Sequence, residues 1–192
     1  MDVDLHCNRR CGLWYVPMAL DAGVDEIAHM PYDALPDAVI ARSVAAKVLW
    51  TPTLDLYMVS GQTNFGRVPG IDPKYVITNG AIANLRRVVA AGGQIALGTD
   101  YGGTPGTFQD GLPMIELELM QQAGMTPMQI LVAATKTAAF ACGKADALGT
   151  IAPGKIADIL VVNGNPLEDL HRLQDVRLVI KSGTIIREEA KE

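Results

Sequence analysis

Short apolar runs alternate with amphipathic segments over most of the chain. The runs have the length of buried parallel strands, and the segments between them repeat apolar residues every three or four positions, as a helix with one buried face does. Glycine or proline residues end most of these segments. The expected strands lie at about 24–28, 48–51 and 95–99, and the expected helices at 11–22, 34–46, 72–91 and 112–123. This alternation predicts an α/β fold in which βα units build a parallel sheet with right-handed crossovers.

After about residue 143 the pattern changes to short strands and turns. Apolar runs occur at 159–162, 176–180 and 184–186. Ser182 and Gly183 lie between the last two runs, and a two-residue connection that contains glycine predicts a tight β-hairpin. We therefore expect a βα part in residues 1–143 and a small β unit in residues 144–192.

Composition indicates a globular, soluble protein. The 192 residues are 49% hydrophobic, which is enough for a core. Acidic residues (21) outnumber basic ones (16) and no basic block occurs, which argues against a nucleic-acid partner. The acidic start is unlike a secretory signal, and the longest apolar region, Cys11–Leu20, is too short to cross a membrane. Three cysteines without dense spacing suit a reducing compartment, so we expect a cytoplasmic protein.

Several predicted strands end in residues that can carry chemistry. Asp100 follows the run 94–99, and parallel sheets place their chemistry at the carboxyl ends of strands, so Asp100 is a candidate metal ligand or general base. The alternative is a turn in which Asp100 caps its own backbone. His29 ends an earlier strand, with a core or capping histidine as the alternative, and His6 ends a brief apolar stretch. His171 is interpreted as a surface histidine.

Six segments follow one another with a characteristic order and spacing between about Ala19 and Arg187. They are residues 19–29, 51–53, 97–100, 123–127, 133–135 and 148–158. Together they resemble the amidohydrolase superfamily, in the branch that includes imidazolonepropionase-like and prolidase-like hydrolases. Each segment alone is unspecific, and the ordered set carries the resemblance.

The resemblance implies a metal-dependent (β/α)8 TIM barrel with an appended β-sandwich, of which this chain would supply the last barrel strands and the C-terminal part of the sandwich. His29 corresponds to the metal-binding histidine of the sixth strand. Asp100 corresponds to the aspartate of the eighth, which contacts the metal and handles the proton of the attacking water. His6 is the candidate for the histidine of the fifth strand, although Cys11 lies nearer the place that family spacing indicates. Tyr101 and the loop after it would line the substrate pocket.

Strands one to four of such a barrel have no counterpart in the chain. The resemblance therefore lacks the His-x-His pair of the first strand and the bridging lysine or glutamate of the fourth. An incomplete barrel leaves unpaired strand edges, so the chain resembles the C-terminal half of a larger protein. Three alternatives stay open: part of a longer enzyme, a catalytically inactive fragment, or a half-barrel completed by a separate chain or a second copy.

The activity that the resemblance implies is hydrolysis of a carbon–nitrogen bond in a small-molecule substrate: a cyclic amide, an amidine or a small peptide. A divalent metal held by histidine and carboxylate lowers the pKa of bound water to about 7 and polarises the carbonyl. Asp100 would take the water proton and pass it to the leaving nitrogen. Histidine and aspartate accept zinc, iron, manganese or nickel, and we expect zinc.

Overall fold

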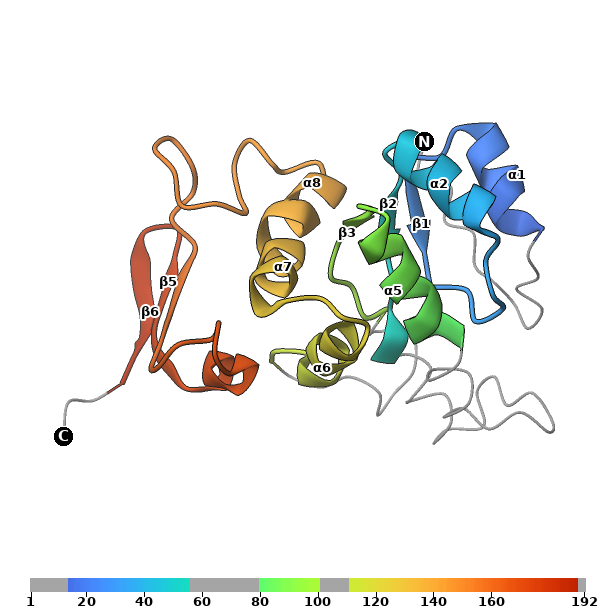
Figure 1. Ribbon diagram of the computed structural model, residues 1–192. Helices are drawn as coiled ribbons and strands as arrows, with labels where there is room; N and C mark the ends of the chain where they lie inside the picture. Colours follow the sequence, from blue (N-terminus) through green and yellow to red (C-terminus); the bar gives the residue numbers. More distant parts are fainter. Residues whose placement is uncertain (1–13, 56–79, 101–110, 190–192) are drawn as a thin grey trace. The chain divides into compact units, whose positions relative to one another are not determined.

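The computed structural model describes residues 14–55, 80–100 and 111–189 (Figure 1). Helices and strands alternate in the first part and a β-sheet closes the second, which confirms the predicted α/β class. The chain forms two compact units, Met1–Met125 and Thr126–Glu192. Within the described residues, no helix combines the length and the hydropathy that a membrane crossing requires.

The first unit contains a parallel three-stranded sheet in the order β1-β2-β3. Its strands are β1 (Glu26–Ala28), β2 (Leu49–Thr51) and β3 (Gln94–Ile95). Trp50 on the central strand is fully buried and pairs with Ile27 on one side and Ile95 on the other. All three predicted strands are confirmed, but β3 is shorter than expected. After Ala96, whose N–H donates to the carbonyl of Trp50, the chain continues to Asp100 outside the ladder.

Within the described residues, four helices accompany this sheet at predicted positions, while residues 11–13 and 72–79 of the predicted helices lie outside the described part of the chain. The four helices are α1 (Tyr15–Ala22), α2 (Asp37–Ala45), α5 (Ile82–Ala90) and α6 (Met114–Gln122). Gly23 ends α1 in a left-handed conformation with φ of 72°, which glycine adopts without a steric penalty. Helix α2 begins later than predicted, because Pro36 is extended and serves as its N-cap.

The second unit begins with a helical segment and ends in an antiparallel sheet. Its helical part comprises α7 (Pro127–Val132), a π-helical turn (Ala133–Thr137) and α8 (Ala138–Ala141), followed by β4 (Ile159–Val162), a 3₁₀ turn (Leu170–Gln174), β5 (Val176–Lys181) and β6 (Thr184–Glu188). Thr126 and Gln129 form a reciprocal capping box at the start of α7. Ser182 and Gly183 both have positive φ, as a tight hairpin turn between β5 and β6 requires, so the predicted hairpin is confirmed.

Candidate active site

His29 lies directly after β1, at the carboxyl end of the strand. Its backbone N–H donates to the carbonyl of Thr51 at 2.9 Å, so the neighbouring strand fixes the backbone of the histidine. The backbone of His29 is left-handed, with φ of 64°, and the residue is 8% exposed. The histidine is thus held at the sheet edge where parallel-sheet proteins place their functional groups.

Thr53 contacts this histidine from the segment that follows β2. Its Oγ1 lies 2.7 Å from Nδ1 of His29, and both side chains are buried. A hydrogen bond at one ring nitrogen of a histidine selects the tautomer and so determines what the other nitrogen can do. Thr53 therefore orients the ring of His29 and leaves Nε2 directed to other partners.

Asp100 approaches the other ring nitrogen. Its Oδ2 lies 3.9 Å from Nε2 of His29, and its side chain is 43% exposed. The fold thus brings together the two residues that the sequence predicts at the ends of separate strands. Their roles as metal ligands remain predictions.

These three residues share an unusual backbone conformation. His29, Thr53 and Asp100 have φ values of 64°, 47° and 57°. Left-handed backbone is uncommon outside glycine, and for a β-branched residue such as threonine it is a genuine outlier. Such strain costs on the order of 1–3 kcal/mol per residue and persists where the surrounding structure imposes it, which is often a functional site.

The other predicted site residues belong to segments outside the described part of the chain. His6 and Tyr101 lie outside the described residues, as does Cys11. His171 lies in the second unit on the 3₁₀ turn and is exposed, which confirms its interpretation as a surface histidine.

A divalent ion beside His29 and Asp100 would need ligands in addition to these two residues. Within residues 14–55, 80–100 and 111–189, no group of three or more histidine, cysteine or acidic side chains converges closely enough to hold a metal ion. Two ligands that each lie about 2 Å from one zinc ion are separated by roughly 3–4 Å. Nε2 of His29 and Oδ2 of Asp100, 3.9 Å apart, therefore lie within reach of one divalent ion at the long end of this range, and such an ion would need further ligands.

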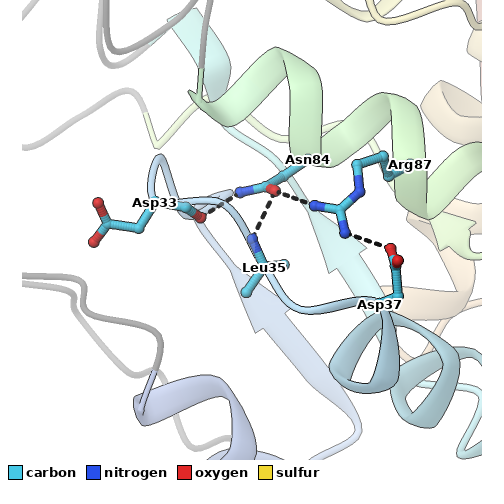
Figure 2. Close-up of polar contacts among 5 residues, drawn as sticks. All are labelled: Asp33, Leu35, Asp37, Asn84 and Arg87. Atoms are coloured by element: carbon cyan, nitrogen blue, oxygen red, sulfur yellow. Dashed lines mark hydrogen bonds and ion pairs between the residues drawn. The ribbon is translucent and has the colours of Figure 1, made fainter.

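A buried hydrogen-bond network fixes the segment between His29 and α2 (Figure 2). Asn84 on α5 is 1% exposed, and its Oδ1 accepts from the backbone N–H of Leu35 at 3.0 Å. Its Nδ2 donates to the carbonyls of Pro31 and Asp33, both at 2.8 Å. Arg87 adds a longer hydrogen bond to the same Oδ1, at 3.3 Å, and an ion pair with Asp37 at 2.6 Å. Asn84 thereby ties the loop after the histidine to a helix.

Sequence reasoning missed a buried acid beside the end of β2. Glu116 on α6 is fully buried, and its Oε2 accepts from the backbone N–H of Asp55 at 2.6 Å. Burial raises the pKa of Glu116 to about 8, the backbone amides of Asp55 and Leu54 oppose that rise, and the Asp55 carboxyl adds to it. Burial also raises the pKa of Asp55.

A signal for this acid was present in the sequence. Leu119 and Met120, three and four positions after Glu116, are apolar, so the helical period places the glutamate on the apolar face of the predicted helix. A buried acid at such a position requires hydrogen-bond partners or neutralisation. Thr53 carried no comparable signal, because threonine after a strand is ordinary.

A profile of the amidohydrolase family matches residues 1–186. The chain belongs to the amidohydrolase family. The imidazolonepropionase of Geobacillus kaustophilus is 34% identical to it over 113 residues, which make up 57% of this chain and 26% of the relative. The amidohydrolase resemblance in the sequence is therefore confirmed.

Solved structures extend the similarity over most of this amidohydrolase chain. A Xaa-Pro dipeptidase with methionine bound in its active site superposes with a TM-score of 0.73 and 28% identity, over 91% of this chain and 42% of that one. A prolidase complexed with N-methylphosphonate-L-proline gives a TM-score of 0.68 and 27% identity, over 91% and 43%. The chain thus spans about a quarter of the curated relative and about two fifths of these structures.

Proposed function

We propose that this amidohydrolase-family chain takes part in metal-dependent hydrolysis of a carbon–nitrogen bond in a small-molecule substrate. The observation that carries the proposal is the placement of Nε2 of His29 at 3.9 Å from Oδ2 of Asp100 at the carboxyl edge of a parallel sheet. A cyclic amide, an amidine and a small peptide are the substrate classes. Relatives named as an imidazolonepropionase and a Xaa-Pro dipeptidase support this range.

The chemistry of the donors supports a divalent metal, with zinc as the first expectation. A bound divalent ion supplies a water of lowered pKa and polarises the substrate carbonyl. His29 would bind the ion through Nε2, with its Nδ1 proton donated to Oγ1 of Thr53. Asp100, whose carboxylate is partly open to solvent, is placed to accept the proton of the attacking water and to deliver it to the leaving nitrogen. His6 as a further ligand and Tyr101 as a residue of the substrate pocket complete the proposal.

The experiment that tests this function replaces Asp100 in the intact native protein. Asp100→Asn keeps the size of the side chain and removes its basicity, so hydrolysis of dipeptides and lactams in the presence of zinc should fall by at least about 100-fold. His171→Asn is the matched control, because His171 is an exposed histidine of the other unit. Unchanged turnover in Asp100→Asn would remove Asp100 from the mechanism.

We also propose that residues 1–143 form the last strands and helices of a (β/α)8 barrel and that residues 144–192 form part of a β-sandwich. Coverage of 91% of this chain but 42% of the Xaa-Pro dipeptidase supports the partial barrel. Ile185 and Ile186 on β6 are 56% and 63% exposed, and a second sheet in a sandwich would cover apolar residues of this kind.

A second candidate is a chain that is inactive unless another polypeptide completes the barrel. The three-stranded parallel sheet favours it, because β1 and β3 each have one neighbouring strand within the described residues. The intact mass of the native polypeptide and its sedimentation separate the cases. A mass well above 20.5 kDa would place the chain in a longer enzyme. A mass of 20.5 kDa with a second copy or another chain in the particle would favour completion, and a lone folded monomer without turnover would favour an inactive fragment.

A further inference from the structure

Glu116 connects α6 to the segment that carries Thr53. Its carboxyl is fully buried and accepts the Asp55 N–H at 2.6 Å, the short end of the range for such a bond. The backbone N–H of Leu54 also interacts with this carboxyl and favours its charged form. The described residues offer no hydrogen-bond partner to its other oxygen, Oε1. The glutamate therefore binds the main chain immediately after Thr53.

Thr53 needs such support, because its left-handed backbone is strained. A β-branched residue at φ of 47° keeps this conformation only where the surrounding structure imposes it. On the N-terminal side, the carbonyl of Pro52 accepts from the backbone N–H of Met30 at 2.9 Å. On the C-terminal side, Glu116 holds Asp55. Thr53 is fixed between these two hydrogen bonds, and its Oγ1 then meets Nδ1 of His29.

We propose that Glu116 is a positioning residue for the His29–Asp100 site: it holds the backbone of residues 53–55 so that the Thr53 hydroxyl orients the imidazole of His29. The inference rests on the proposed function, because the orientation of Nε2 affects activity only if Nε2 binds a metal. Glu116 binds the backbone N–H of Asp55, so its influence on His29 passes through the main chain.

The test compares variants of the full chain by the ¹⁵N chemical shifts of the His29 imidazole, recorded without metal, and by the affinity for Zn²⁺ alone. Glu116→Asp shortens the side chain by one methylene and withdraws the acceptor, whereas Glu116→Gln retains a carbonyl oxygen for the Asp55 N–H. Thr53→Val supplies the reference state without the hydroxyl. Glu118→Asp, two positions away on α6 and half-buried, is the matched control.

We expect the His29 shifts in Glu116→Asp to move towards those of Thr53→Val and the Zn²⁺ affinity to fall about 10-fold. Glu116→Gln and Glu118→Asp should match the unmodified chain in both measurements. Wild-type shifts in a folded Glu116→Asp would overturn the proposal, as would an equal displacement in Glu118→Asp. If Glu116→Asp does not fold while Glu116→Gln does, the residue serves folding of the whole unit and the positioning role is wrong.

The two readouts keep this inference separate from the proposed function. The imidazole shifts require neither metal nor turnover. A His29 ring that responds to Glu116 in a protein with no hydrolase activity would support the positioning role and remove the proposed function. If hydrolysis depends on Asp100 but the His29 shifts do not change in Glu116→Asp, the proposed function would be supported and the positioning role would be wrong.

Discussion

The hydroxyl of Thr53 lies 2.7 Å from Nδ1 of His29, and this contact joins the ends of β1 and β2. If Nε2 of the histidine bound a metal, Nδ1 would keep its proton and donate a hydrogen bond to Oγ1 of Thr53. A group behind a metal ligand in this way usually contributes 10- to 100-fold to metal affinity. The hydrogen bond between Thr53 and His29 is therefore expected to affect metal affinity measurably.

Removal of the Thr53 hydroxyl should weaken metal binding with little change in the fold. Thr53→Val preserves volume and β-branching but leaves Nδ1 of His29 without this partner, so we expect Zn²⁺ affinity to fall by about 10-fold or more in calorimetric titration. Thr53→Ser keeps the hydroxyl and should remain within about threefold of the original affinity. Equal losses in both variants would mean that packing of the methyl group, and not the hydrogen bond, matters.

Glu116 should make stability depend on pH across the neutral range. The folded pKa of about 8 exceeds the ordinary value of 4.5, so the folded state keeps a proton that the unfolded state releases between these values. The contribution of Glu116 is therefore complete below about pH 4.5, declines as the pH rises and is lost above about pH 8. The slope is on the order of 1 kcal/mol per pH unit.

Urea unfolding at pH 5, 6.5 and 8 checks this dependence. Glu116→Gln cannot ionise, so the free energy of unfolding should vary less with pH than in the unmodified protein. Burial also raises the pKa of Asp55, so any contribution from this residue has the same sign. An identical slope in both proteins would show that Glu116 does not titrate in this window.

Loss of Asn84 should destabilise the first unit strongly. Asn84→Ala leaves the N–H of Leu35 and the carbonyls of Pro31 and Asp33 without this partner, and each unsatisfied buried group costs about 1–3 kcal/mol. We expect a loss on the order of 3 kcal/mol in the free energy of unfolding. Arg87→Ala, which removes a partly exposed side chain from the same network, should cost less than about 1 kcal/mol. Similar losses in both would mean that the arginine supports the loop as much as the asparagine does.

Substitution of Gly183 tests how much the hairpin turn of the second unit depends on left-handed backbone. Its φ is 78°, and a Cβ there would meet nothing within 4 Å, so the penalty for Gly183→Ala is conformational and not steric crowding by neighbours. We expect destabilisation by about 1 kcal/mol, measured by thermal unfolding. Gly183→Asn should cost less, because asparagine tolerates left-handed backbone. A neutral Gly183→Ala would show that the turn changes type without cost.

The sequence alone determined the local elements and the family. Helix α1 ends at Gly23 and the Ser182–Gly183 turn joins β5 to β6, because each depends on a few adjacent residues with restricted backbone preferences. Strand positions followed from the apolar runs. The short length of β3 could not be predicted from its apolar run. A strand continues only as far as its neighbour continues beside it, and β2 ends at Thr51.

The tertiary structure decided how the site is supported. Thr53 and His29 are 24 positions apart, and Glu116 and Asp55 are 61 apart, so no local pattern reports these contacts. Helical periodicity could place Glu116 on a buried face. Which main-chain N–H would donate a hydrogen bond to it depended on how α6 lies beside the segment that follows β2. The left-handed backbone of Thr53 has the same origin: threonine does not prefer it, and the surrounding hydrogen bonds impose it. Sequence identified the groups that can do chemistry, and only packing between distant segments determined how they are held.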